Sequence, residues 1–156
     1  SLHDALPICK QINTGADASL TGRLTERLTT KAGAQFMDAK YKGQPKHDGK
    51  VPRDIPEWTA NIWANYELTD TIDLNAGVYY VGSRFGTDDN DQMKKSAYTL
   101  LDTGAIYRMP IENDKQLLLR FKVNNVLDKE YKESGDYTGM TLGQGRNYTL
   151  SAQYNF

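Results

Sequence analysis

The sequence predicts an all-β protein, namely a run of about seven strands from an antiparallel up-and-down transmembrane β-barrel. Apolar and polar residues alternate with a period of two, and the apolar faces of the middle strands carry no charge. Each segment supplies about 10–13 residues, close to what a tilted strand needs to cross a bilayer. Short and long links alternate along the chain, which is typical of the turns and loops at the two ends of such barrels.

The composition favours this class over several others. The formal net charge is −1, so no basic surface indicates nucleic-acid binding. Mean hydropathy is −0.67, and no stretch approaches the ~18 apolar residues of a spanning helix. Cys9 is the single cysteine, so an internal disulfide is excluded. The sequence contains no nucleophile–base pair, phosphate-binding loop or metal-ligand spacing that would indicate an enzyme. His47 lies in a Gly/Lys/Pro-rich loop, where we expect it to be solvated.

The first two strands are expected at about 11–24 and 28–41, with a tight turn at 25–27 between them. Their apolar faces share one side of the predicted sheet and comprise Ala16, Ala18, Leu20, Gly22, Leu24, Leu28, Ala32, Ala34 and Phe36. The loop that follows contains Pro45, Pro52 and Pro56. Because proline cannot donate to a ladder, this segment should lie outside the sheet.

The third and fourth strands are expected at about 57–68 and 72–84, paired about a turn at Asp70. Their apolar faces comprise Trp58, Ala60, Ile62, Ala64, Tyr66, Leu68, Ile72, Leu74, Ala76, Val78 and Tyr80. This register places Leu68 opposite Ile72 and Ile62 opposite Val78, with Trp63 over Gly77 on the polar side. A polar loop follows, and its run Asp88-Asp89-Asn90-Asp91 should be solvated.

The last three strands are expected at about 98–109, 116–124 and 146–156, with a short link at 110–115 and a long loop at 125–145. Outward positions of the first two are Leu101, Ala105, Tyr107, Met109, Leu117, Leu119, Phe121 and Val123. In the final strand the apolar positions are Tyr148, Leu150, Ala152, Tyr154 and Phe156. This pattern, with an aromatic last residue, resembles the signal read by the outer-membrane assembly machinery of Gram-negative bacteria.

The first nine residues, 1–9, fit neither the strand pattern nor a signal peptide. We expect them to be a non-native or disordered lead-in, with a genuine short lead-in as the alternative. Residues 10–156 are then expected to be the C-terminal part of a longer barrel protein.

Several stretches carry a resemblance to the TonB-dependent outer-membrane receptors, closest to the ferric-siderophore receptors. They are residues 51–63, 79–84, 98–108 and 122–131, and residues 143–147 lead into the last strand. The most specific is Lys-Val-Asn-Asn-Val-Leu-Asp-Lys-Glu-Tyr at 122–131, which is similar to the family's penultimate-strand motif. The resemblance implies a barrel of about 22 strands around an N-terminal plug, of which this chain is an open C-terminal part.

The resemblance also implies a function for the intact receptor, which is not an enzyme. It would capture a ferric siderophore and import it with energy from the TonB system, acting through a plug that this chain lacks. The other expected partners are the assembly machinery and the lipid bilayer, with no nucleic acid. The iron would be carried within the siderophore, so no protein cofactor or metal ligand is expected.

Three loop aromatics, Phe85, Tyr131 and Tyr137, are candidate ligand contacts, with ordinary loop packing as the alternative for each. Two other functions stay open at this point. One is a passive outer-membrane pore or structural barrel, and the other is a soluble β-sheet ligand-binding module.

Overall fold

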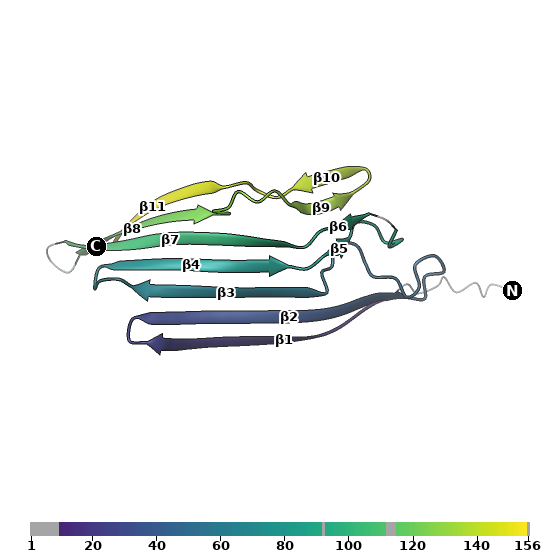
Figure 1. The fold of residues 1–156 in the computed structure, drawn as a ribbon, viewed down its shortest axis with the longest axis horizontal. Coiled ribbons are helices and arrows are strands. Elements are labelled where there is room, and N and C mark those ends of the chain that lie inside the picture. Colours follow the sequence, from purple (N-terminus) through teal and green to yellow (C-terminus); the bar gives the residue numbers. More distant parts are fainter. Residues whose placement is uncertain (1–9, 92, 112–114, 156) are drawn as a thin grey trace.

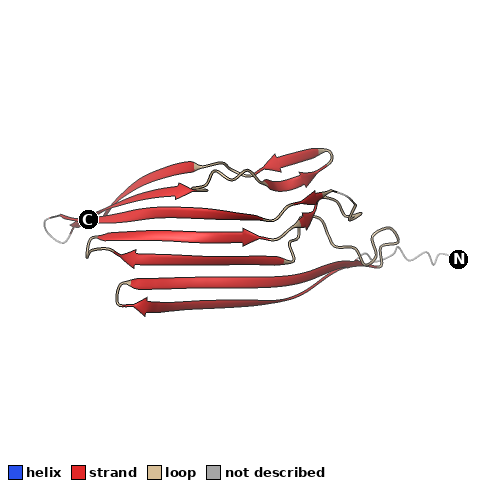
Figure 2. Ribbon diagram, in the orientation of Figure 1, coloured by secondary structure: helices blue, strands red, loops and turns tan. Residues whose placement is uncertain are grey.

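The computed structural model describes residues 10–91, 93–111 and 115–155, and these form one open, seven-stranded antiparallel sheet (Figures 1 and 2). The strands follow chain order, β1-β2-β3-β4-β7-β8-β11, as the up-and-down prediction requires. Their bounds are β1 Lys10–Thr25, β2 Leu28–Lys42, β3 Trp58–Glu67, β4 Ile72–Val81, β7 Tyr98–Ile111, β8 Lys115–Asn124 and β11 Asn147–Asn155. Since β1 and β11 are the two edges, the described sheet does not close, which confirms the expected fold class.

The register of β3 and β4 is the predicted one. Ile62 lies opposite Val78, and Trp63 lies opposite Gly77. The ladder ends before the pair expected between Leu68 and Ile72, which instead flank the turn. In the described part of the chain, no helix has the length and hydropathy needed to cross a membrane.

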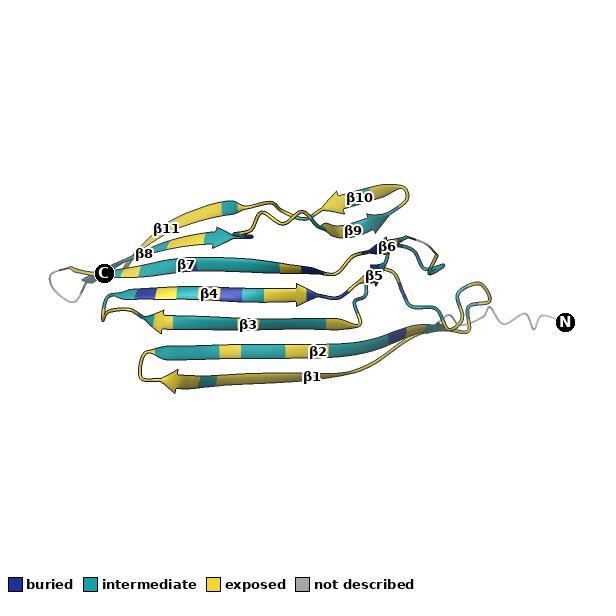
Figure 3. Ribbon diagram, in the orientation of Figure 1, coloured by how far each residue is buried: buried dark blue, intermediate teal, exposed yellow. Residues whose placement is uncertain are grey.

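Exposed residues occur along the strands of the sheet (Figure 3), and many of them are large apolar residues that are not packed into a core. Ile62 is 51% exposed, and Leu20 and Leu150 are each 75% exposed. The buried hydrophobic residues in the described ranges are Ala39, Val81 and Tyr98. A soluble module would bury such a face to gain hydrophobic free energy, whereas a barrel wall presents it to lipid. The exposure therefore disfavours the soluble alternative.

The opposite side of the sheet is polar and carries paired charges. Trp63 covers Gly77 so closely that a Cβ added to the glycine would lie 2.4 Å from the indole. The Lys122 ammonium lies 5.8 Å from the centre of the Trp63 ring and 3.6 Å from an oxygen of Asp102. Such a mixed, partly hydrated face is typical of a barrel interior.

One predicted link is wrong. The turn expected to begin at Pro110 begins later, because β7 continues to Ile111 and Pro110 lies opposite Gln116 in β8. On its other side β7 pairs with β4 only as far as Tyr107. A proline is tolerated in a strand where the ladder is incomplete on one side, and this end of β7 is such a place.

Both of the later long loops contain short hairpins that the sequence pattern did not predict. β5 (Arg84–Phe85) pairs with β6 (Lys94–Lys95), and β9 (Lys132–Asp136) pairs with β10 (Gly139–Leu142). These strands are short and mostly polar, so they show no alternation long enough to detect. The predicted lead-in at 1–9 and the predicted terminal aromatic Phe156 lie outside the described residues.

Candidate functional site

The three long links lie together at one end of the sheet (Figure 1). We call residues 43–57, 82–91, 93–97 and 125–146 the loop cluster. In outer-membrane barrels the long loops are the extracellular ones, and binding residues are found disproportionately on loops. The contacts within this cluster therefore decide what kind of surface a ligand would meet.

Asp54 joins all three links of the loop cluster. Its carboxylate pairs with the ammonium of Lys95 and also accepts a hydrogen bond from Gly135 N at 3.3 Å. Its own backbone N–H donates to the carbonyl of Phe85 at 2.9 Å. The Lys95 side chain has no exposed surface, whereas that of Asp54 is 29% exposed. A buried ammonium needs a partner of opposite charge, so this pair fixes the second link against the first.

Two arginines add further bonds across the loop cluster. Arg53 pairs with Asp136 at 2.8 Å. Arg84, which is buried, donates to the carbonyls of Lys132 and Glu133 at 2.7 and 2.9 Å. Because Arg84 is the first residue of β5 and the two carbonyls belong to β9, it attaches the β9–β10 hairpin to the second link.

The acidic run after Phe85 is not solvated as expected. Asp88 accepts hydrogen bonds from the Tyr41 hydroxyl at 3.0 Å and from Arg53 N at 2.9 Å. Asn90 exchanges two hydrogen bonds with the backbone of Val51, at 2.7 and 2.6 Å. The prediction holds for Asp91, which is exposed, and is wrong for the half-buried residues before it. Asp88 accepts from β2 and from the first link, and Asn90 both accepts from and donates to the first link.

Asp89 and His47 form another contact between these two links. His47 Nε2 lies 3.1 Å from Asp89, and Lys46 and Lys50 lie 3.4 and 3.6 Å from the same carboxylate. Partial burial raises the pKa of Asp89, but the Lys46 hydrogen bond and the nearby positive charges outweigh it, so that the pKa falls below the usual 3.8. The expectation of a freely solvated His47 is wrong, since its side chain is only 23% exposed.

The most specific sequence motif, at 122–131, has a structural role. Asn125 takes a left-handed φ of 50° and is buried. Its side chain donates to the carbonyls of Lys129 and Gln144 at 2.9 and 3.1 Å and accepts from Lys129 N at 2.8 Å. Asp128 accepts from Arg146 N at 2.7 Å. These hydrogen bonds close the base of the last long loop. They account for the asparagine and the aspartate of the motif as structural residues, with no contact to a ligand required.

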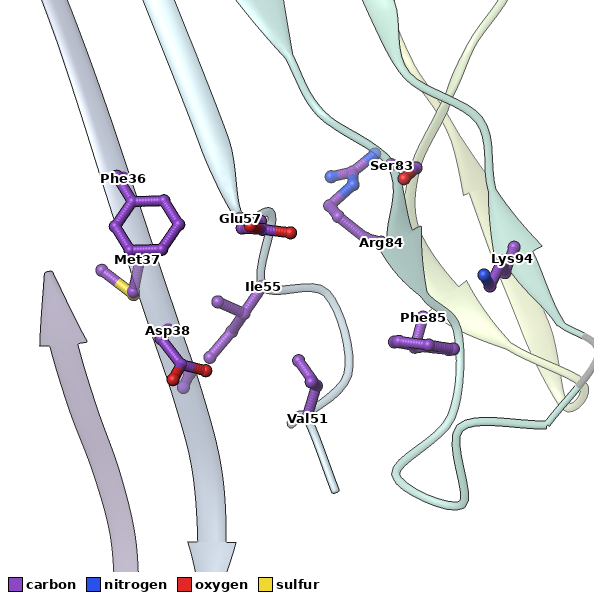
Figure 4. Close-up of a pocket in the computed structure, with 11 residues that line it drawn as sticks. Phe36, Met37, Asp38, Val51, Ile55, Glu57, Ser83, Arg84, Phe85 and Lys94 are labelled. Atoms are coloured by element: carbon purple, nitrogen blue, oxygen red, sulfur yellow. The ribbon is translucent and has the colours of Figure 1, made fainter. Parts of the chain in front are cut away.

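A cavity of about 440 Å³ opens between residues 36–39 of β2, residues 51–57 of the first link and the β5–β6 hairpin (Figure 4). Its lining is mixed, with apolar, acidic and basic groups, and comprises Phe36, Met37, Asp38, Ala39, Val51, Ile55, Glu57, Ser83, Arg84, Phe85 and Lys94. A cavity of this size falls within the range of small-ligand sites.

The three predicted ligand aromatics do not converge on one site. Phe85 lines the 440 Å³ cavity, and the Lys94 ammonium lies 5.0 Å from its ring centre. Tyr131 packs on Tyr98 with 4.2 Å between ring centres, and both line a second hollow of about 260 Å³. Tyr137 is 68% exposed and hydrogen-bonds to Asp91. Of the three, Tyr137 is therefore the side chain with the least packing inside the protein.

The predicted assembly residues of the last strand share the outward face of β11. Tyr148, Leu150, Ala152 and Tyr154 are exposed there, and each lies opposite an outward-facing residue of β8. Tyr148 stacks near Phe121, with 6.3 Å between ring centres. As a signal for the assembly machinery this set stays a prediction.

The fold and its loop cluster define a class: a wall segment of an outer-membrane β-barrel that carries structured long loops at one end. The sequence model of the family described as "TonB dependent receptor-like, beta-barrel" matches residues 10–126. The chain therefore belongs to the TonB-dependent receptor β-barrel family and is part of a bacterial outer-membrane protein.

Individual relatives agree with this assignment. The chain is 28% identical over 155 residues to the ferrioxamine receptor of Yersinia enterocolitica, covering 97% of this chain and 22% of that receptor. It is 26% identical over 147 residues to the ferrichrome outer membrane transporter/phage receptor of Escherichia coli K12, covering 91% of this chain and 20% of the relative. The crystal structure of BauA, the ferric preacinetobactin receptor of Acinetobacter baumannii, matches with a TM-score of 0.83 at 25% identity, covering 96% of this chain and 23% of BauA. The chain thus spans about a fifth of the length of the curated relatives it matches.

Proposed function

We propose that the intact receptor containing this chain imports ferric siderophores across the outer membrane with energy supplied by the TonB system. The observation that carries the proposal is the family match over residues 10–126. Relatives of similar sequence are named as receptors or transporters for ferrioxamine and ferrichrome. In this scheme the chain supplies part of the barrel wall and three of the outer loops, while the plug that contacts TonB belongs to the rest of the receptor.

The loop cluster supports a role in capturing the chelate. Its cross-links leave a pre-organised surface, which lowers the entropy lost when a ligand is bound. Tyr137, Phe85 and Tyr131 supply aromatic faces and hydroxyls suited to planar or hydroxamate chelates. The iron is carried within the siderophore, so the protein contributes contacts to the chelate and no ligands to the metal.

The outward face of β11 has a separate role in this proposal. Tyr148, Leu150, Ala152 and Tyr154, followed by Phe156, present the apolar alternation that the outer-membrane assembly machinery would recognise during insertion. The same face then enters lipid in the finished barrel.

Uptake of radiolabelled ferric siderophores into cells tests the transport proposal. Cells that express the full-length receptor, in a background lacking other siderophore receptors, are offered ferrioxamine, ferrichrome and a ferric catecholate, with and without functional TonB. We expect saturable uptake of at least one chelate, and its loss without TonB. Uptake that is unsaturable and independent of TonB would instead establish a passive pore.

A matched pair of tyrosine variants tests the loop contacts. Tyr137→Ala removes an exposed loop ring, whereas Tyr107→Ala removes an outward ring of the barrel wall in β7. We expect the first to weaken chelate affinity by about three- to tenfold, the value of one aromatic contact, and the second to leave affinity unchanged. Equal affinities in the two variants would remove Tyr137 from the binding surface.

A further inference from the structure

The cavity of about 440 Å³ lies where the sheet lacks a strand, beyond the first residue of β3 (Figure 4). β2 continues to Lys42, whereas its pairing with β3 ends at Phe36. On the other side of β3 the chain leaves β4 at Val81 and enters β5 at Arg84. Neither β2 nor β4 is an edge of the described sheet, so both walls of the cavity are formed by described residues.

The backbone of Ala39 is unpaired on the cavity side of β2. Met37 N donates to the carbonyl of Glu57 at 2.9 Å, and four residues further along Tyr41 N donates to a carbonyl of the same link at 2.9 Å. Since alternate residues of a strand point their backbone groups to the same side, those of Ala39 point there too. Ala39 lines the cavity and is 1% exposed, yet no hydrogen bond joins its backbone to another described residue on this side. Buried backbone groups are normally paired, so an extended ligand that bonded to Ala39 would remove a free-energy cost.

Arg84 supplies a second unpaired donor, on the β5 wall of the cavity. Its two terminal nitrogens donate to the carbonyls of Lys132 and Glu133, and the residue is 8% exposed. Of the buried side-chain nitrogen and oxygen atoms in the described ranges, Arg84 Nε is the one that lacks a hydrogen-bond partner. The Lys94 ammonium stands on the same wall, 5.0 Å from the centre of the Phe85 ring. This wall is therefore suited to an anionic oxygen.

The acidic groups lie on the β2 side of the cavity (Figure 4). Asp38 is already paired with Lys40 at 2.9 Å, whereas the exposed Glu57 makes no ion pair with a described residue. Val51 from the first link lies between the acidic and the basic side in this view, with Ile55 beside it (Figure 4). The cavity thus has positive groups at one end, a negative group at the other and apolar surface between them.

We propose that this cavity binds a short peptide with free ends, holding its carboxylate at Arg84 and Lys94 and its backbone at Ala39. The peptide ammonium faces Glu57, and its apolar side chains contact Val51. A short peptide carries all of these groups at once: a terminal carboxylate, a terminal ammonium, apolar side chains and main-chain donors and acceptors. The volume of about 440 Å³ admits a ligand of this size and excludes a folded partner.

The peptide is a second class of ligand beside the ferric chelate. Its binding does not depend on import, because every group that it contacts belongs to this cavity. It can therefore be measured directly, whether or not the receptor transports a siderophore.

Calorimetric titration of the purified full-length receptor with the tripeptide alanyl-leucyl-alanine tests the proposal. Two derivatives are compared with the free tripeptide: its C-terminal amide, which lacks the carboxylate, and its N-acetyl form, which lacks the ammonium. We expect the amide to bind about tenfold more weakly, because a buried donor loses its charged acceptor. The N-acetyl form should bind about threefold more weakly, because Glu57 is exposed and its charge is screened. Hydrogen exchange of residues 37–41 should slow when the free tripeptide is present, since Ala39 then gains a partner.

Receptor variants place the binding in the cavity. Lys94→Gln should weaken tripeptide binding about threefold, whereas Lys129→Gln, the loss of an exposed lysine that does not line the cavity, should leave it unchanged. Arg84→Lys keeps the charge but lacks the Nε donor, and should weaken binding about tenfold. Heat modifiability shows whether each receptor is folded. If Arg84→Lys does not fold, Ser83→Phe replaces it; this variant fills the cavity from an exposed position and should abolish binding.

Several results would refute the proposal. The free tripeptide could fail to bind, or could bind no more tightly than its amide. Equal affinities in Lys94→Gln and Lys129→Gln would place the peptide elsewhere, as would unchanged exchange of residues 37–41. Displacement of the tripeptide by ferrichrome would assign the cavity to the chelate, and would also refute a separate peptide site.

Discussion

Asp54 in the first long link pairs with Lys95 in the second, and the Lys95 side chain has no exposed surface. The same carboxylate reaches Gly135 in the third link. One residue therefore connects three segments that are distant in sequence, and does so at a left-handed φ of 61°. The loops of this receptor are consequently expected to behave as one unit.

Replacing Lys95 by Met tests this connection. The change keeps the volume but leaves Asp54 without its counter-ion, which should destabilise the loop cluster by about 3 kcal/mol. Hydrogen exchange of residues 84–95 and 132–142 should rise together. The double variant Asp54→Asn with Lys95→Met should recover part of the protection, because no unpaired charge then remains. Faster exchange confined to 84–95 would show that the loops move separately.

Crowding at Gly77 gives a second prediction. A Cβ there would lie 2.4 Å from the Trp63 ring, whereas a Cβ at Gly22 would have nothing within 4 Å. Gly77→Ala should therefore lower barrel stability by about 1–3 kcal/mol, with little effect from Gly22→Ala as the matched control. Urea unfolding of the full-length receptor from lipid vesicles measures both. Because a smaller ring relieves the crowding, Trp63→Leu should rescue Gly77→Ala, and failure to do so would assign the loss to the backbone instead.

The sheet could be predicted from sequence because each of its strands shows the alternation of apolar and polar residues within its own segment. In β3 the residues from Trp58 to Tyr66 alternate so regularly that strand, face and register follow from the pattern alone. The faces of β8 and β11 follow in the same way. A strand in a barrel wall contacts lipid on one face and the hydrated interior on the other. Its residues therefore alternate between apolar and polar along the whole strand, and this alternation is visible in the sequence.

The loop cluster could not be predicted because its structure rests on contacts between distant residues. The β9–β10 hairpin is attached through Arg84, whose two acceptors lie 48 and 49 residues further along the chain. The acidic residues after Phe85 look solvated in sequence, yet Asp88 is held by Tyr41, 47 residues before it. Asn125 was recognised as part of a motif, but its buried side chain and left-handed backbone are visible only in the fold.

The pH dependence of the Asp89 contact gives a third prediction. Because the pKa of Asp89 is lower in the folded protein than the usual 3.8, ionisation of this carboxylate stabilises the fold above that value. The contribution should be fully present at neutral pH and decline as the pH falls below about 3.8 through the lower folded value. Proteolysis by pepsin at the first long link, residues 43–50, should increase over this acid range. In Asp89→Asn the cleavage should be higher than in the wild type above this acid range, should converge with it at the acid end, and should lack the acid step.

Asn125 gives the last prediction, because its amide closes the loop from 125 to 146 with three side-chain hydrogen bonds. Asn125→Ala removes all three bonds. It also puts alanine, which has no polar side chain to stabilise a left-handed backbone, at a φ of 50°. Together these changes should lower the stability of the loop by about 3 kcal/mol. Asn125→Gly loses the same bonds but tolerates that backbone, so it should be about 1 kcal/mol less harmful. Asn124→Ala is the matched control, since it loses the 2.7 Å bond to Asn147 alone. The readout is hydrogen exchange at the Lys129 amide, which donates to Asn125 in the intact loop. If Asn124→Ala exposes this amide as much as Asn125→Ala does, the loop is held by the end of β8 and not by the buried asparagine.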